Sequence, residues 1–334
     1  MSALATRQRL RSGVDMRSTS DVEHTGGPIS LPLNDIGGAH IPALFLGDHG
    51  FLAKLGSELS DDEIHQRMLV ALETGTVGLA GADERLLKLA RAAEKSVGRP
   101  VTLMHHTDLM LKLGDTGVPY HRCAATLGHV LRQTYEVHPA DDTVLGFLER
   151  FSRRGPLGGD ELAALTLDRS HLEQMQTLME QFAPNVVTVG GDFLDVLLLS
   201  GRSDLVHDGL VELRRIVGGA VLVATMYVAA LVPADTAAIA PLIDGFLVPV
   251  NSEGTAMLPD RDTAISWMEA ATAPILAMHT MSSGIRSPQQ ALDFVYQLGV
   301  RAAVVGASRV STIQDTIHAA SEALSPDANS RASR

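Results

Sequence analysis

Histidine and aspartate side chains follow several apolar runs of the sequence, at the points where strands of a parallel sheet would end. The residues that we single out for catalysis are Asp48, His49, His105, His106, Asp192 and His279. A histidine changes charge near neutral pH, and a neighbouring aspartate can orient or ionise it. The pattern predicts general acid–base chemistry, in which the histidines move protons and Asp48 and Asp192 orient them. The alternative is that each is an ordinary polar residue at the start of a loop.

A metal centre is a second interpretation of the same side chains. Its ligands would come from Asp48, His49, His106, Asp192 and His279. A catalytic metal site needs three protein ligands and an open position. The sequence has no H-x-H or H-x-x-x-H pattern, and adjacent strand residues point to opposite faces, so His105 and His106 do not both reach one ion. We therefore predict no metal and keep a divalent ion as the alternative.

Two glycine- and serine-containing loops near the end of the sequence indicate an anion site. They contain Ser282, Ser283 and Gly284 in the first loop, and Gly306, Ser308 and Arg309 in the second. Backbone N–H groups at the start of a helix, together with Arg309 or Arg286, can bind a phosphate or carboxylate. The alternative is that these are ordinary loop and capping residues.

Eight apolar runs, most of them followed by a segment of helical periodicity, must position these side chains. The predicted strands are 41–46, 76–80, 101–104, 186–189, 220–224, 245–250, 275–278 and 302–305. This alternation is typical of a (β/α)8 TIM barrel, in which active sites lie at the carboxyl ends of the strands and the last two loops often hold phosphate. An open doubly wound sheet is the alternative, but it does not need eight evenly spaced units.

Local signals refine the barrel prediction. A turn at 34–38 predicts an N-terminal capping hairpin, and S-x-x-E or S-x-x-Q capping boxes at Ser60, Ser287 and Ser311 predict helix starts. The long interval 107–183 predicts the third helix plus a helical insertion or lid, with helices at 124–134, 142–153 and 170–182. We expect a single barrel domain over 28–324, a disordered arm over 1–27 and a disordered tail over 325–334.

Composition limits the possible partners. Of 334 residues, 45% are apolar and 20% charged, which is typical of a globular chain, and the net charge of −12 argues against nucleic acid as a partner. The single cysteine, Cys123, excludes an internal disulfide and fits a reducing cytoplasm. No secretory signal and no membrane-spanning run is predicted. We expect a cytoplasmic protein that binds a small molecule.

Both ends of the sequence resemble a known family. LPLNDIGGAHIPALFLGDHGF resembles the opening of aldo-keto reductases, where a hairpin leads into the first barrel strand. LAMHTMSSG and SPQQALDFVYQLGVRAAVVGASRVSTIQDT resemble the last two units of that superfamily. The resemblance implies a TIM barrel in which Ser282, Ser283, Gly284, Gly306, Ser308 and Arg309 hold the pyrophosphate of NAD(P).

The resemblance fails where the family's reactive groups would lie. The family places Asp and Tyr at and after strand two, Lys at the end of strand three and His at the end of strand four. This sequence has Ala80, no following Tyr, His105 or His106, and Gly190 or Gly191. We therefore predict lyase-, isomerase- or cyclase-type proton transfer on a small anionic or phosphorylated metabolite. The alternatives are an NAD(P)H-dependent oxidoreductase with an altered catalytic set, and a non-catalytic barrel that binds a metabolite or a protein.

Overall fold

Eight parallel strands close into a barrel. The computed structural model describes residues 28–47, 59–81, 83–134, 155–307 and 309–325. In spatial order the barrel strands are β3 (Leu44–Gly47), β4 (Gly78–Gly81), β5 (Leu103–Thr107), β9 (Val186–Gly190), β10 (Val221–Thr225), β11 (Gly245–Pro249), β12 (Ile275–Met278) and β13 (Ala302–Gly306). β13 pairs in parallel with β3, with Ala303 opposite Leu44, so the sheet has no free edge. The predicted TIM barrel and its eight strands are confirmed.

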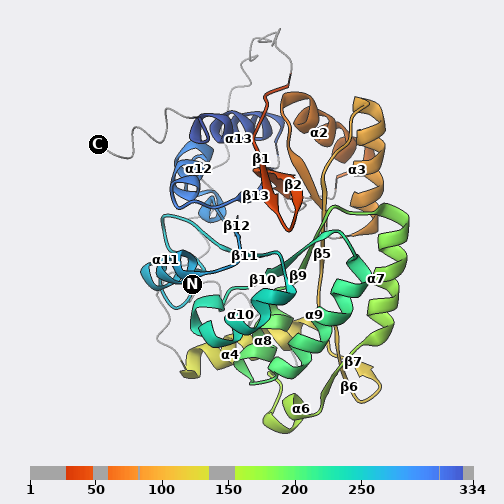
Figure 1. Ribbon diagram of the computed structural model, residues 1–334, viewed down its shortest axis with the longest axis vertical. Coiled ribbons are helices and arrows are strands. Elements are labelled where there is room, and N and C mark those ends of the chain that lie inside the picture. The colour runs from red at the N-terminus through yellow and green to blue at the C-terminus, as the bar shows by residue number, and fades with distance from the viewer. Residues whose placement is uncertain (1–27, 48–58, 82, 135–154, 308, 326–334) are drawn as a thin grey trace, which may run out of the picture.

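Helices surround the barrel (Figure 1). They are α2 (Asp61–Thr74), α3 (Glu84–Val97), α4 (Tyr120–Thr134), α6 (Gly159–Ala163), α7 (Arg169–Phe182), α8 (Asp192–Leu199), α9 (Ser203–Val217), α10 (Pro233–Ile239), α11 (Arg261–Ala270), α12 (Pro288–Gln297) and α13 (Val310–Ala323), with the 3-10 turns η1 (Ala229–Leu231), η2 (Ala240–Leu242) and η3 (Ser282–Gly284). Of these helices, none is long and apolar enough to span a membrane. The predicted arm, the predicted helix 142–153 and residues 326–334 of the predicted tail lie outside the described residues.

Two of the three predicted capping boxes mark helix starts. The Ser60 hydroxyl accepts from the Glu63 N–H at 3.3 Å, and Glu63 accepts from the Ser60 N–H at 2.9 Å. Ser287 caps α12, where its hydroxyl accepts from the Gln290 N–H. The prediction at Ser311 is wrong, because the chain already turns into α13 at Arg309 and Ser311 lies inside the first turn.

A hairpin closes the amino-terminal end of the barrel, as predicted. β1 (Leu33–Ile36) and β2 (Ala39–Pro42) pair antiparallel. The predicted turn at 34–38 is shorter in the structure, because only Gly37 and Gly38, with φ of +59° and +78°, lie outside the pairing. Ile36 and Ile41 pack into the barrel interior against the first residues of the strands, such as Val186. The hairpin thereby leaves the opposite end of the barrel for a site.

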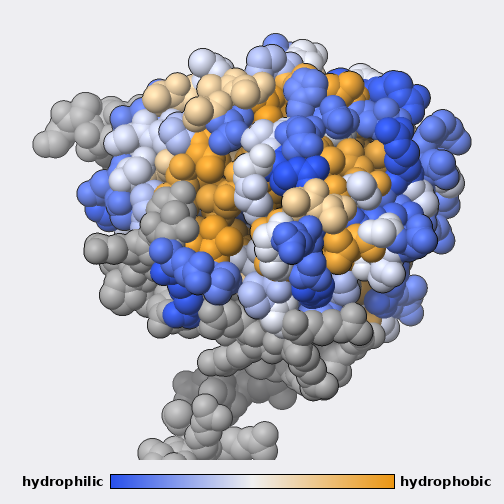
Figure 2. Space-filling model, turned by 90° about the horizontal axis from the view of Figure 1, so that it is seen from below, coloured by the Kyte–Doolittle hydropathy of each residue, from blue (hydrophilic) through white to orange (hydrophobic). Residues whose placement is uncertain are grey.

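The segment between β5 and β9 is an insertion that is not purely helical. Besides α4, α6 and α7 it contains a three-stranded antiparallel sheet of β6 (Leu111–Leu113), β7 (Thr116–Gly117) and β8 (Leu165–Leu167). The helical prediction missed these strands because each has only two or three residues, and because the pairing of β6 with β8 joins segments far apart in the sequence. Figure 1 shows the hairpin above the barrel and this small sheet below it. Figure 2, seen from below, shows areas of apolar surface between polar side chains on that side.

Charged side chains fix the insertion to itself and to the barrel helices. Arg122 of α4 donates to both carboxylate oxygens of Glu161 in α6, at 2.9 and 2.8 Å. Lys112 of β6 contacts Asp168 at 2.9 Å. Arg202, just before α9, donates to the Leu162 carbonyl at 2.8 Å. We infer that the described part of the insertion is a fixed wall of the barrel.

The packing of the barrel interior yields a first prediction. A Cβ atom at Gly78 in β4 would lie 2.3 Å from the ring of Phe45, which is fully buried. Gly78→Ala is therefore expected to lower the free energy of unfolding by about 1–3 kcal/mol through overpacking. Urea unfolding measures this change in the free energy of unfolding. Gly219→Ala is the matched control, because nothing lies within 4 Å of its Cβ position, and it should change stability little. Equal effects of the two substitutions would contradict this account.

Candidate functional site

The two histidines at the end of β5 have different surroundings. Met104 lies in the barrel interior, so side-chain alternation directs His106 inward and His105 toward the helices. His106 Nδ1 lies 2.9 Å from Thr188 Oγ1, and its Nε2 lies 3.6 Å from Asp108. His106 therefore faces the mouth of the barrel, as an acid–base residue must.

His105 lies on the opposite face of the strand from His106. Its side chain is buried, and Nδ1 lies 3.1 Å from the backbone carbonyl of Gly81 on the neighbouring strand. Burial lowers the pKa of His105 to about 4, so the ring is neutral at physiological pH. The expectation that His105 moves protons is not supported, because the ring is directed away from the interior.

Asp192 lies at the start of α8, immediately after a glycine turn that ends β9. Gly190 and Gly191 have φ of +121° and +84°, and a Cβ at Gly190 would lie 2.6 Å from the Thr225 carbonyl oxygen of β10. The turn brings α8 directly to the mouth. Asp192 is only 5% exposed, and its Oδ2 has no hydrogen-bond partner among the described residues.

The pKa of Asp192 is raised to about 6. The main cause is burial, and the nearby charge of Asp108 adds to it, whereas a hydrogen bond from Tyr120 of α4 lowers the pKa. A carboxyl group with a pKa near neutrality exchanges protons readily at physiological pH. Asp192 is therefore a candidate for the base itself, whereas its position in the sequence predicts only that it orients a histidine.

Tyr227 and His279 form a pair across the mouth. Tyr227 follows β10 and His279 follows β12, and the Tyr227 hydroxyl oxygen lies 2.9 Å from His279 Nε2. The two ring centroids are 5.6 Å apart. His279 has φ of +54°, a conformation that side chains other than glycine rarely adopt. This strained backbone holds an exposed imidazole against a phenol, and the pair is the most specific geometry at this end of the barrel.

Asp195 lies one turn into α8 and binds the backbone of Tyr227. Its side chain is fully buried, and Oδ2 accepts from the Tyr227 N–H at 2.9 Å. Its other oxygen, Oδ1, is buried without a hydrogen-bond partner among the described residues. Burial raises the pKa of Asp195 well above its usual range. The carboxyl group thereby fixes the turn from which the Tyr227 ring projects.

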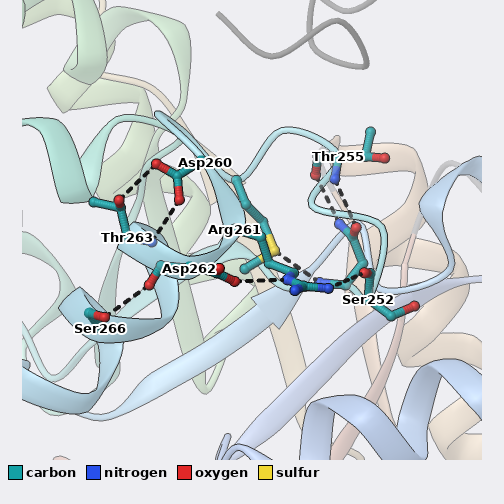
Figure 3. Close-up of polar contacts among 9 residues, drawn as sticks. Ser252, Thr255, Asp260, Arg261, Asp262, Thr263 and Ser266 are labelled. Carbon is teal, nitrogen blue, oxygen red and sulfur yellow. Dashed lines mark hydrogen bonds and ion pairs between the residues drawn. The ribbon is translucent and has the colours of Figure 1, made fainter.

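Side chains of the loop after β11 bind the backbone of the same loop, so the loop has a supporting role (Figure 3). Asn251 donates to the Thr255 carbonyl at 2.8 Å and accepts from the Thr255 N–H at 2.9 Å. Arg261 donates to the Ser252 carbonyl at 3.1 Å, and Asp260 caps α11 through the Thr263 N–H at 2.9 Å. Asn251 lies two residues after the end of β11, and both the oxygen and the nitrogen of its side-chain amide bind the loop.

The predicted anion-binding residues are described in part. Ser282 is 1% exposed with φ of +46°, and its Oγ has no partner among the described residues. A Cβ at Gly284 would meet no atom within 4 Å. Gly306 ends β13, and Arg309 is the N-cap of α13 without a side-chain cap hydrogen bond. Arg286 instead pairs with Glu253, its Nε lying 2.6 Å from Oε1. Ser308 and the Ser283 side chain lie outside the described part.

Two of the predicted acid–base residues, Asp48 and His49, fall outside the described residues, so the structure does not test them. The metal alternative uses Asp48 or His49 as one of its ligands, so the structure does not test that ligand either. Within the described ranges, no group of three His, Cys, Asp or Glu side chains could hold a metal ion.

Burial raises the pKa of the Cys123 thiol, which disfavours a nucleophilic thiolate there.

Comparison with known proteins supports the architecture. No protein-family model matches the chain, and no curated protein matches its sequence. A putative aldo-keto reductase from Pseudomonas aeruginosa superposes with a TM-score of 0.51 and 17% identity, covering 88% of this chain and 94% of that one. An aldo-keto reductase from Brucella melitensis superposes with a TM-score of 0.50 and 11% identity, covering 90% of this chain and 98% of that one. The barrel has an aldo-keto-reductase-like fold. At such identities the likeness shows the fold alone.

In this aldo-keto-reductase-like barrel, the strand ends differ from the family pattern as the sequence predicts. Ala80 lies in β4, His106 in β5 and Gly190 at the end of β9. The polar groups that the structure gathers instead are His106, Asp192, Tyr227 and His279, with Tyr120 from the insertion. Sequence reasoning missed Tyr120 and Asp195, because neither follows a predicted strand.

The burial of Asp192 yields a stability prediction. Because its pKa is higher in the folded protein than in the unfolded chain, its contribution to stability is present below the unfolded pKa and is lost as pH rises through about 6. Asp192→Asn is expected to be more stable than the wild type at pH 8, by up to about 3 kcal/mol, and to show less pH dependence between pH 4 and 8. Thermal unfolding at both pH values measures this. Parallel curves for the two proteins would contradict it.

Proposed function

We propose that the protein is an acid–base enzyme that transfers protons on a small carbonyl compound at the carboxyl end of its barrel. The observation that carries the proposal is the hydrogen bond between Tyr227 and His279, 2.9 Å long, formed by residues that follow two different barrel strands. Burial raises the pKa of Tyr227, and the charges of Asp192 and Asp195 add to this. The phenol is therefore protonated at neutral pH and suited to act as an acid.

The roles follow from the protonation states. Asp192, ionised above about pH 6, removes a proton from the carbon next to the substrate carbonyl. Tyr227 donates its proton to the carbonyl oxygen, so an enol forms and no net charge is left on the substrate. His279 Nε2 lies 2.9 Å from the phenol oxygen and stabilises the tyrosinate until the enol returns its proton to Tyr227. If Asp192 delivers its proton to another carbon while the enol proton goes back to Tyr227, the reaction is an isomerisation. If a group instead leaves from the carbon beside the deprotonated one, taking up the proton from Asp192 as it leaves, the reaction is an elimination.

An anionic substrate fits the loops beside this pair. The buried Ser282 hydroxyl lacks a partner among the described residues and lies three residues after His279. The exposed side chain of Arg309, at the start of α13, carries hydrogen-bond donors and a positive charge. A carboxylate or phosphate of the substrate would satisfy both groups. This supports the small anionic metabolite that the sequence predicts.

Exchange of carbon-bound hydrogen with solvent tests the proposal without knowledge of the final product. The protein is incubated in D2O with a panel of small carboxylated and phosphorylated aldehydes and ketones, and deuterium at the carbon next to the carbonyl is followed by NMR. We expect catalysed exchange of at least one compound, and its loss in Tyr227→Phe. Exchange that survives both Tyr227→Phe and His279→Asn would refute the proposed roles. A panel on which the wild type has no effect would favour the non-catalytic binding barrel.

An NAD(P)H-dependent oxidoreductase is the second candidate. The fold and the unpartnered Ser282 hydroxyl favour it, because Ser282, Gly284 and Arg309 fit the phosphate part of a dinucleotide. Bound NAD(P)H would supply a hydride, and Tyr227 would then protonate the resulting alkoxide. Titration with NADPH, followed by fluorescence or calorimetry, separates the candidates. Tight binding that Arg309→Ala weakens would favour the oxidoreductase, and absence of binding would favour the proton-transfer enzyme.

A further inference from the structure

One buried hydroxyl group at the mouth of the barrel has no role in the proposed reaction. Thr225, the last residue of β10, is 5% exposed, and its Oγ1 has no hydrogen-bond partner among the described residues. Asp192 Oδ2 and Ser282 Oγ are buried and unpartnered in the same way. A buried polar atom without a partner is rare and costs stability, so three of them at one end of a barrel indicate a polar ligand.

The Thr225 side chain faces the interior of the barrel. Val223 of the same strand packs in the interior cluster, whereas Ala224 and Met226 pack in the cluster that contains side chains of the surrounding helices. Because successive side chains of a strand alternate between its faces, Thr225 lies on the inner face, beyond Val223. The hydroxyl group is thus directed into the mouth, two residues before Tyr227.

Thr225 adjoins the turn that brings Asp192 to the mouth. Its carbonyl oxygen accepts from the Gly191 N–H at 2.8 Å, and the residue opposite it on β9 is Gly190. Gly190 has no side chain, so the β9 residue beside Thr225 does not cover the hydroxyl group. The unpartnered hydroxyl and the unpartnered carboxylate oxygen therefore belong to the same corner of the mouth.

A second threonine on the inner face shows the contrast. Thr188 of β9 lies opposite Val223, one layer deeper in the barrel than Thr225. Its hydroxyl oxygen lies 2.9 Å from His106 Nδ1, so this buried hydroxyl has a partner within the protein. Burial alone therefore does not explain why the hydroxyl of Thr225 has none.

A neutral hydroxyl group of the substrate fits this corner better than a charged group. Asp192 is ionised above about pH 6, so it repels an anion beside it. A cation would pair with the carboxylate and weaken it as a base. A hydroxyl group can both donate to and accept from a threonine. The part of the substrate beside Asp192 is the carbon that loses its proton in the proposed reaction.

We propose that the Thr225 hydroxyl binds a hydroxyl group on the carbon from which Asp192 removes the proton, so that the substrate is an α-hydroxy aldehyde or ketone. The inference rests on the proposed function, in which Asp192 is the base, and names the substrate class of that site. The hydrogen bond directs the carbon–hydrogen bond toward Asp192, while Tyr227 faces the carbonyl oxygen.

Thr225→Val tests the inference, because valine has nearly the shape of threonine but no hydroxyl. Thr316→Val is the control: it removes a fully buried hydroxyl that has a partner, the Thr312 carbonyl of α13 at 2.6 Å. Deuterium exchange into hydroxypyruvate and pyruvate, which differ only in the hydroxyl group, is followed by NMR with the full chain. Thermal unfolding with and without each compound measures binding independently of turnover.

We expect Thr225→Val to lower the preference for hydroxypyruvate over pyruvate about 10- to 100-fold, the usual effect of leaving a bound hydroxyl unpaired. Thr316→Val should leave this preference unchanged. The rise in unfolding temperature that hydroxypyruvate produces should shrink in Thr225→Val. Without a ligand, Thr225→Val should unfold at no lower temperature than the wild type, because it loses no hydrogen bond, whereas Thr316→Val should unfold at a lower one.

An equal preference in the wild type and Thr225→Val would overturn the inference. A wild type that favours pyruvate would overturn it as well, and so would a Thr225→Val variant that unfolds as early as Thr316→Val, because the hydroxyl would then have a structural partner. If the wild type exchanges no compound of the wider panel, the proposed function fails. The unfolding shifts then decide about Thr225: a shift with hydroxypyruvate that Thr225→Val loses supports the hydroxyl site, and its absence overturns it.

Discussion

Tyr227→Phe is expected to lower kcat for the exchange reaction by about 10²- to 10⁴-fold, the usual contribution of a positioned acid or base. The phenylalanine keeps the ring but has no proton to give to the substrate oxygen. The lost hydrogen bond to His279 lies at an exposed position, so its removal should cost no more than about 1 kcal/mol of stability. Steady-state kinetics together with thermal unfolding would show an inactive but folded protein.

His279→Asn provides the partner measurement. Asparagine tolerates positive φ better than most residues, so it suits the backbone at this position, where φ is +54°. Residues that act as a unit give strongly non-additive effects. The double variant should therefore lose little more activity than either single variant. Multiplicative losses would contradict the pair. So would an equal loss of activity in the control Tyr296→Phe, which removes a hydroxyl that donates to the Ala43 carbonyl at 2.8 Å.

The sequence predicts the barrel well because its signals are local. Apolar runs of four or five residues, interrupted by capping serines and glycines, indicate each strand and most helices without knowledge of their partners. These local signals do not indicate α8. All but the last of its residues are buried, so its apolar side chains show no helical stripe, and the Gly-Gly turn before it resembles an ordinary loop.

The site was only partly predictable, because it depends on pairings across long intervals of sequence. His106, Asp192 and His279 follow strands, and their residue types alone indicate chemistry. The partner of His279 is Tyr227, 52 residues earlier, and the partner of the Tyr227 N–H is Asp195, in a helix that the sequence does not indicate. Periodicity carries no information about such contacts, because side-chain rotamers and the strained backbone at His279 decide them.

Asp195→Ala is expected to have the largest effect on stability. The substitution leaves the N–H group of Tyr227 without its acceptor and opens a small cavity in α8. We expect the free energy of unfolding to fall by about 2–5 kcal/mol in urea titrations. Asp208→Ala, which removes a carboxylate with 74% of its side chain exposed, is the control and should stay within about 0.5 kcal/mol of the wild type.

Asp195→Asn separates the hydrogen bond from the charge. Because burial raises the pKa of Asp195 well above its usual range, the fold favours the protonated form of this group, which an asparagine resembles in shape and acceptor geometry. The asparagine variant should therefore keep the turn under Tyr227 and remain within about 1 kcal/mol of the wild type near pH 5. The contribution of Asp195 to stability is present below its unfolded pKa and is lost as pH rises toward its folded pKa. The wild type should accordingly lose stability relative to Asp195→Asn as pH rises. An asparagine variant as unstable as Asp195→Ala would show that the carboxyl group has another role.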